Sequence, residues 1–256
     1  MNGPAPKLLI FQYIEKLIIS RIKLTMSGRM NLFLDLDNTL ISSEPLADFD
    51  TKENKNKAVK FNFYDMDDYY VVFERPGLQE FLDFAFANFN VSVWTAASRE
   101  YGSFIINNII LPKNKPGRKL KLYFFSYHCD WSERNRRGHK GLSLLWDDMN
   151  LPGFTPENTI IIDDLPEIKE DQPCNAIHIK PFEFSKKGSQ NDDELIKVRE
   201  KLEWINANRG ACPTGDRTYK SKEETPRRKS KKQRKKEKKK SGQSNKGWLE
   251  VVTDDE

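Results

Sequence analysis

The chain has 256 residues, enough for one sizeable domain with appendages, and its hydrophobic content of 37% is low for a chain that is globular throughout. Its formal net charge of +5 arises in one segment, because residues 220–240 hold thirteen Lys and Arg against three Glu. The rest is mildly acidic, so the global charge does not support a nucleic-acid surface on the folded body. Three cysteines and three histidines without metal-ligand spacing argue against a zinc site or a disulfide framework and favour a reducing compartment.

The first predicted element is an amphipathic helix over residues 7–24, where polar residues recur at helical spacing within an apolar stretch. The stretch is short and charged for a membrane span, and it has no cleavage site of the signal-peptide type. We expect a helix that packs on the domain, within an N-terminal part at residues 1–28. Association with a membrane surface is the alternative.

An apolar strand then leads into Asp35 and Asp37, in the sequence NLFLDLDNTL over residues 31–40. Alternate strand residues face the same way, so both carboxylates are expected at the C-terminal end of the strand, where open α/β sheets bind ligands. Neighbouring carboxylates repel each other, and a divalent cation relieves that repulsion. The pattern predicts a metal-dependent catalytic site, with a polar surface turn as the alternative.

Downstream, a polar loop or flap is expected at residues 48–60, and hairpin strands are expected between residues 61 and 73. The remaining predicted elements are helices at 78–88, 98–111, 140–150 and 192–206, and strands at 91–95, 121–127, 159–164 and 176–179. Strands that alternate with helices predict an α/β fold with a doubly wound, mostly parallel sheet and helices on both faces.

Three of the predicted strands end in polar residues, namely Asp35 with Asp37, Thr95, and Asp163 with Asp164. Lys140 begins the predicted helix that lies between the second and third of these strand ends. Adjacent acids at a buried strand end need a cation or a base nearby. A lysine at a helix start opposes the helix dipole, which favours a functional role for it over a structural one.

These motifs together resemble the haloacid dehalogenase superfamily, and within it the FCP/SCP group of NLI-interacting-factor-like phosphatases that act on the RNA polymerase II C-terminal domain. The matching stretches are DLDNTL (35–40), ERPGLQEFL (74–82), VWTAASREY (93–101), HKGLSLL (139–145), IIIDDLPE (160–167) and NAIHIKPF (175–182). The resemblance runs from residue 31 to 205. It implies a haloacid-dehalogenase-like phosphatase domain at residues 29–210 with a small hairpin insertion.

The resemblance further implies a Mg²⁺-dependent mechanism that forms an aspartyl-phosphate. Asp35 is the expected nucleophile, and Asp37 the expected acid and base. The expected metal group consists of Asp35, Asp37 through its backbone carbonyl, Asp163 and Asp164. Within that group, Asp163 is expected to lie next to the direct ligands, without contacting the metal itself, and to position Lys140.

Four further residues receive roles from the resemblance. Thr95 and Lys140 are expected to bind phosphate oxygens and to neutralise the charge that grows in the transition state. Thr39 is expected to brace the catalytic loop. Tyr101 is expected near the substrate groove, and a place in the core is the alternative for this aromatic residue.

The chain departs from the family pattern at two places. Residues 126–129 read SYHC where an Arg-Glu pair is common, with Arg134, Arg136 and Arg137 nearby as substitutes, and Leu165 replaces a serine. Both departures concern peptide specificity. We expect a protein phosphoserine or phosphothreonine substrate, such as the RNA polymerase II C-terminal domain. The alternatives are nucleotide, nucleic-acid-end or small-molecule phosphates, or a non-catalytic binding module.

The C-terminal part at residues 211–256 is predicted to be a disordered, Lys/Arg-rich tail, because it has almost nothing to bury. The basic run at 220–240 suits an import receptor or nucleic acid, which favours a nuclear over a cytoplasmic location. A solvated terminus is the alternative.

Overall fold

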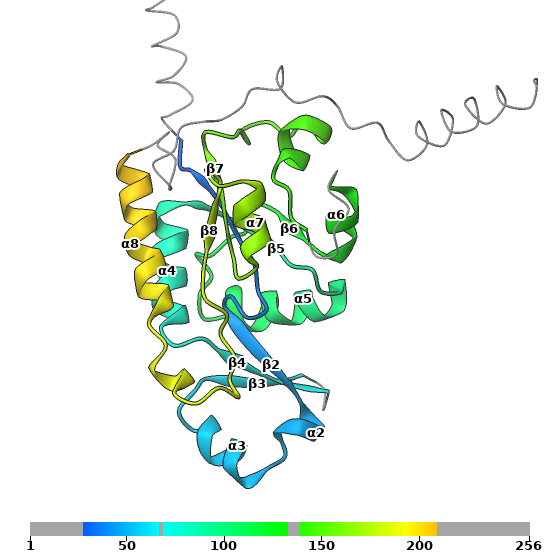
Figure 1. Cartoon of the computed structure of the whole chain (residues 1–256), viewed down its shortest axis with the longest axis vertical. Helices are drawn as coiled ribbons and strands as arrows, with labels where there is room; N and C mark the ends of the chain where they lie inside the picture. Colours follow the sequence, from blue (N-terminus) through cyan, green and yellow to red (C-terminus); the bar gives the residue numbers. More distant parts are fainter. Residues whose placement is uncertain (1–27, 67–68, 133–138, 209–256) are drawn as a thin grey trace, which may run out of the picture. The chain divides into compact units, whose positions relative to one another are not determined.

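The computed structural model describes residues 28–66, 69–132 and 139–208 (Figure 1). The helix predicted at residues 7–24, the three arginines between 134 and 137, and the tail from residue 211 lie outside these residues. Among the helices that are described, none combines the length and apolar character needed to cross a membrane.

A five-stranded parallel sheet forms the centre of the fold, with the strand order β6-β5-β1-β7-β8. The strands are β1 (Asn31–Leu34), β5 (Asn90–Trp94), β6 (Tyr123–Phe124), β7 (Thr159–Asp163) and β8 (Ala176–His178). Leu34 of β1 is in register with Val93 on one side and Ile162 on the other. The carboxyl ends of these three strands therefore meet at one edge of the sheet, as predicted.

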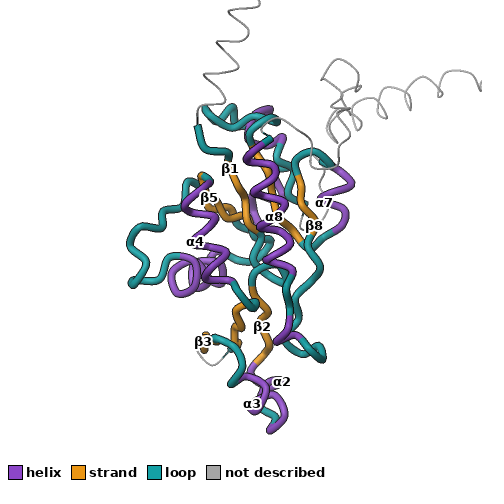
Figure 2. Tube along the Cα trace, turned by 90° about the vertical axis from the view of Figure 1, so that its left-hand side faces the viewer, coloured by secondary structure: helices purple, strands orange, loops and turns teal. Residues whose placement is uncertain are grey.

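Helices cover both faces of this sheet. They are α4 (Leu78–Asn88), α5 (Arg99–Ile105), α6 (Ser126–Trp131), α7 (Pro166–Asp171) and α8 (Glu194–Ala207), with π-helical turns η1 (Ile106–Ile110) and η2 (Leu144–Asp148) and the 3₁₀ turn η3 (Ser189–Asn191). Alternation along β1 divides the core, because Leu32 and Leu34 join the cluster under α4 and α8 whereas Phe33 joins the cluster under α6 and α7. Helices α4 and α8 contact each other, and Figure 2 views the face that they cover.

The insertion after the first strand is larger than the predicted hairpin. Strands β2 (Ile41–Pro45), β3 (Phe63–Met66) and β4 (Tyr70–Glu74) form an antiparallel sheet in the order β2-β4-β3, at the lower end of Figure 1. The predicted polar loop at 48–60 is wrong, because this stretch forms α2 (Leu46–Phe49) and α3 (Lys52–Ala58). Thr51 caps α3, and few residues of the two helices are buried. Helices this short, with so few apolar residues, show no helical spacing of apolar residues in the sequence.

Two other boundaries differ from the prediction. The strand expected at 121–127 ends at Phe124, because Ser126 donates its N–H to the Ala97 carbonyl at 3.0 Å and begins α6. The helix expected from Lys140 is instead an irregular segment followed by η2. Cys129 is a buried free thiol, whereas Cys174 is disulfide-bonded, a single bond that the argument against a disulfide framework did not predict.

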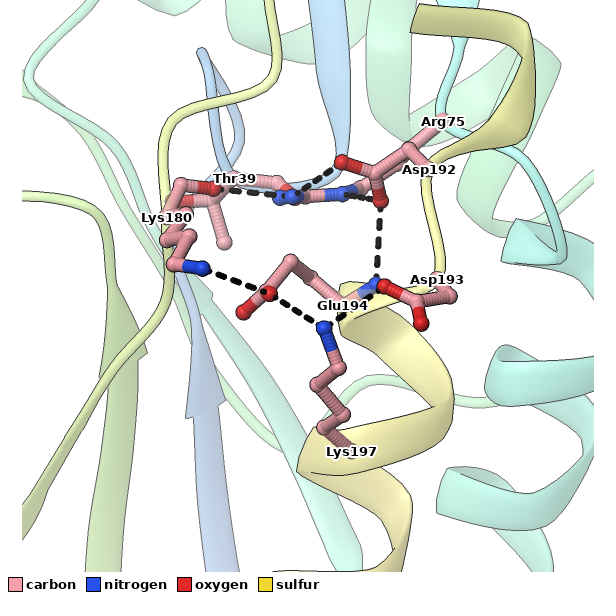
Figure 3. A network of polar contacts seen from close by, with 7 residues as sticks. All are labelled: Thr39, Arg75, Lys180, Asp192, Asp193, Glu194 and Lys197. Atoms are coloured by element: carbon pink, nitrogen blue, oxygen red, sulfur yellow. Dashed lines mark hydrogen bonds and ion pairs between the residues drawn. The ribbon is translucent and has the colours of Figure 1, made fainter.

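Arg75 ties the loop after β1 to the segment before α8 (Figure 3). Its buried guanidinium donates to both Asp192 carboxylate oxygens at 2.7 and 2.9 Å. It also donates to the carbonyl oxygens of Thr39 at 2.9 Å and Lys180 at 2.8 Å. One side chain thus joins three segments that are far apart in the sequence.

Replacing Arg75 with Met is expected to lower the free energy of unfolding by about 3 kcal/mol, because the Asp192 carboxylate and two carbonyl oxygens lose their donor. Lys197 belongs to the same network but bonds to Asp193 and Glu194 at the surface, as Figure 3 shows. Lys197→Met should therefore leave the unfolding curve close to wild type. Urea unfolding followed by circular dichroism measures both variants, and equal effects would contradict the assignment to Arg75.

Candidate active site

The residues predicted for catalysis converge at the carboxyl edge of the sheet. Asp35 directly follows β1, Thr95 directly follows β5, and Asp163 is the last residue of β7. The loop after Asp35 folds tightly, with the N–H groups of Leu40 and Ile41 both bonded to the Leu36 carbonyl. The parallel register of the sheet therefore assembles residues that are separated by more than half of the described chain.

Lys140 is the cation at the centre of this group. Its ammonium group donates to Asp35 Oδ1 and, at 2.8 Å, to Asp163 Oδ2. All three side chains are at most 5% exposed. Gln172 holds the backbone that directly follows the lysine side chain, since it donates to the Lys140 carbonyl at 2.8 Å and accepts from the Leu142 N–H at 3.0 Å. Lys140 is thus placed by α7 and its C-terminal cap, not by a helix of its own.

Burial sets the ionisation of the carboxyl groups. It raises the pKa of Asp35 to about 7, with Lys140 opposing, the Asp163 charge adding to the rise, and the Thr39 hydroxyl opposing it. Burial, followed by the charge of Asp163, raises the pKa of Asp164 to about 6. Burial acts to lower the pKa of Lys140, but the two carboxylates outweigh it and raise that pKa, so the lysine stays charged.

Three carboxyl groups could hold a metal ion, because Asp35, Asp163 and Asp164 each offer an oxygen within 4.8 Å of the others. Both oxygens of Asp163 already have partners, since Oδ2 accepts from Lys140 and Oδ1 accepts from the Leu165 N–H at 2.9 Å. Asp35 and Asp164 are therefore the better ligands. Carboxylate oxygens are the donors that Mg²⁺ prefers, and their excess negative charge suits a divalent cation.

The Asp37 carboxyl group points to a different partner. Tyr101 Oη of α5 donates to Asp37 Oδ1 at 2.5 Å, and Ser43 Oγ of β2 lies 2.5 Å from the same Tyr101 Oη. Burial raises the pKa of Asp37, whereas the hydrogen bond from Tyr101, the charge of Lys140 and the Thr95 hydroxyl oppose that rise. Tyr101 is half-buried and packs against the hydrophobic core, and its expected place near the substrate groove stays a prediction.

The two threonines are buried in the loops around the carboxylates. Thr95 Oγ1 accepts from the Ala97 N–H at 3.0 Å, which closes the turn after β5. Thr39 lies in the loop after β1, and its carbonyl is held by Arg75. The structure thus brings every residue of the predicted site into one neighbourhood, although the catalytic and metal-binding roles remain predictions.

Several residues that support this site carry no signal in the sequence. Ser43, Gln172 and His178 were not singled out, and His178 Nε2 lies 3.0 Å from the Asp164 carbonyl oxygen. Arg75 lies within the matching stretch at residues 74–82, but that motif does not indicate its contacts. A supporting side chain acts through contacts between distant segments, so no local spacing indicates it.

A family model for NLI interacting factor-like phosphatases matches residues 30–211 of this chain. The chain belongs to this family. Among its relatives, the "Putative CTD phosphatase-like protein 355R" of Invertebrate iridescent virus 6 is 48% identical over 176 residues, which cover 67% of this chain and 96% of the relative. The "Ubiquitin-like domain-containing CTD phosphatase" of Arabidopsis thaliana is 28% identical over 179 residues, covering 68% of this chain and 46% of that protein.

A solved structure, "The Structure of Fcp1, an essential RNA polymerase II CTD phosphatase", matches with a TM-score of 0.52 at 17% identity, covering 76% of this chain and 66% of that chain. At this identity the match concerns the fold alone. It confirms the predicted α/β architecture with a mostly parallel central sheet and helices. Membership of the NLI interacting factor-like family confirms the predicted resemblance. It places the chain in a family of protein phosphatases, which are hydrolases.

Lys140→Met is expected to lower the free energy of unfolding by about 3–5 kcal/mol near pH 8, because Asp35 and Asp163 become buried like charges without a cation. The loss should shrink toward about pH 5. The sign follows from Asp35, whose pKa is raised to about 7 in the folded protein, so protonation favours the folded state and relieves the repulsion. Urea unfolding at both pH values measures the effect, and a loss independent of pH would contradict it.

Proposed function

We propose that the chain is a Mg²⁺-dependent phosphatase that removes phosphate from phosphoserine or phosphothreonine in proteins through an aspartyl-phosphate on Asp35. The observation that carries the proposal is a charged Lys140 between Asp35 and Asp163, with the Asp164 carboxyl group beside them. Membership of a phosphatase family supports the same conclusion. Thr39 is proposed to keep the loop after β1 in place.

In the first step, Asp35 attacks the phosphorus, so a bond forms between its carboxylate oxygen and phosphorus while the bond to the serine or threonine oxygen breaks. Lys140 lowers the repulsion between the anionic carboxylate and the anionic phosphate. Thr95 is proposed to donate its hydroxyl to a phosphate oxygen. When bound by Asp35, Asp164 and the Asp37 backbone carbonyl, Mg²⁺ would supply further positive charge against the developing negative charge.

Asp37 is proposed to move the protons. Burial raises the pKa of its carboxyl group, and in the protonated form this group can give its proton to the departing serine or threonine oxygen. The resulting carboxylate then accepts a proton from the water that attacks phosphorus. That attack breaks the bond to Asp35 and releases inorganic phosphate, which returns both aspartates to their starting states.

A protein substrate is favoured by the size of the insertion. Between Thr39 and Thr95 the described chain forms one three-stranded sheet and two short helices in addition to α4 and β5. A large cap domain, typical of phosphatases for small metabolites, is not among these elements. The names of the viral and plant relatives refer to CTD phosphatases, so a C-terminal-domain phosphopeptide is the first substrate to test. Nuclear location and a partner for residues 220–240 remain predictions.

Asp35→Asn is expected to reduce hydrolysis of both a phosphoserine heptad peptide and p-nitrophenyl phosphate by about a thousandfold or more, because an amide is a poor nucleophile. Asp48→Asn provides a matched control, since Asp48 is an exposed aspartate of α2. Release of inorganic phosphate with Mg²⁺ present measures both variants. Activity that survives in Asp35→Asn would exclude the proposed nucleophile.

Binding of Mg²⁺ is expected to release protons near neutral pH and to weaken toward about pH 5, because only the ionised carboxylates bind the cation. The pKa of Asp35, about 7, and that of Asp164, about 6, place this change between these pH values. Calorimetric titration with Mg²⁺ in buffers of different ionisation enthalpy counts the protons. Asp164→Asn should weaken binding about tenfold or more, and unchanged affinity would remove Asp164 from the metal group.

A further inference from the structure

We propose that Tyr101, supported by Ser43, is a positioning residue that orients the Asp37 carboxyl group toward the leaving oxygen of an alkyl phosphate. This inference rests on the proposed function, because it concerns the proton that Asp37 transfers. It assigns Tyr101 a role other than contact with the substrate. It also gives a function to Ser43, which no motif of the sequence indicates.

The three residues come from three separate elements. Asp37 lies in the loop after β1, Tyr101 lies in the first turns of α5, and Ser43 lies in β2 of the insertion. The Tyr101 ring also contacts Tyr70 of β4 edge to face, with ring centroids 6.0 Å apart. Because the ring is anchored in α5 and packs against the insertion, its hydroxyl stays at one place. A fixed hydroxyl is what the orientation of a neighbouring group requires.

The proton count gives the hydrogen bonds a direction. Tyr101 Oη has one proton, and it donates that proton to Asp37 Oδ1 at 2.5 Å. The contact of 2.5 Å between Tyr101 Oη and Ser43 Oγ must then use the serine proton, so Ser43 donates to Tyr101. The result is a relay of donors that runs from Ser43 through Tyr101 to one oxygen of Asp37.

This relay distinguishes the two oxygens of Asp37. Oδ1 is occupied as an acceptor, which leaves Oδ2 to carry the proton that goes to the leaving group. Negative charge grows on the Asp37 carboxyl group as it loses that proton, and a hydrogen bond to an ionised acceptor is stronger than one to a neutral acceptor. The Tyr101 hydroxyl therefore stabilises the transition state most when proton transfer is most advanced.

Because the proposed effect of Tyr101 depends on proton transfer to the leaving group, substrates with different leaving groups test it. A serine or threonine alkoxide is a poor leaving group and needs a proton as its bond to phosphorus breaks. The p-nitrophenolate ion leaves readily without one. Loss of the Tyr101 hydroxyl should therefore slow hydrolysis of phosphoserine far more than hydrolysis of p-nitrophenyl phosphate.

The test compares kcat and KM of Tyr101→Phe for a phosphoserine heptad peptide and for p-nitrophenyl phosphate. This variant keeps the ring against Tyr70 and removes only the hydroxyl. We expect kcat for the peptide to fall by about tenfold or more and kcat for the aryl phosphate by less than about threefold, with the peptide KM unchanged. Ser43→Ala should show a smaller loss with the same preference, and Ser43→Thr should restore activity because it keeps a hydroxyl.

Tyr70→Phe is the matched control, because it removes a hydroxyl from the neighbouring ring and should leave both activities unchanged. A higher peptide KM with unchanged kcat would show that Tyr101 contacts the substrate and would overturn the proposal. Equal losses of kcat for both substrates would indicate a structural role and would also overturn it. The proposed function fails separately, if Asp35→Asn keeps its activity or if the wild-type protein hydrolyses neither substrate.

Discussion

The structure depends on one buried interaction, the ammonium group of Lys140 between the carboxylates of Asp35 and Asp163. Burial alone disfavours each of these charges, and two carboxylates without the lysine would repel each other in a region of low dielectric. The lysine makes the arrangement tolerable but leaves the group with excess negative charge. That excess suits a divalent cation, and the proposed chemistry brings an anionic phosphate to the same place.

Contacts from outside the site hold this group in its geometry. Gln172 fixes the backbone around Lys140, and Arg75 fixes the loop after β1 against the segment before α8. The insertion also contributes, because Ser43 of β2 contacts the Tyr101 hydroxyl of α5, which in turn donates to Asp37. On our proposal, the insertion therefore contributes to catalysis by orienting the Asp37 carboxyl group.

The sequence predicted the elements with strong patterns and missed those without them. The helix at Leu78–Asn88 and the strand at Thr159–Asp163 were found because each has apolar residues at the spacing of its structure. Residues 48–60 were predicted as a loop, but Thr51 caps a helix there that buries little. The helix expected from Lys140 is helical only from η2 at Leu144–Asp148, because contacts from Gln172 hold the residues directly after Lys140 in an irregular form.

The sequence by itself determined the strands of the parallel sheet, the long helices α4 and α8, the resemblance to a phosphatase family, and the polar residues at the strand ends, because each of these has a local pattern. Tertiary structure alone decided which atoms meet. In the folded chain, the two oxygens of Asp163 accept from Lys140 and from the Leu165 N–H. Asp37 accepts from Tyr101, and the Tyr101 hydroxyl contacts Ser43. Hydrogen bonds and ion pairs act over a few ångströms, and residues far apart along the chain come that close only when the sheet and its layers are assembled.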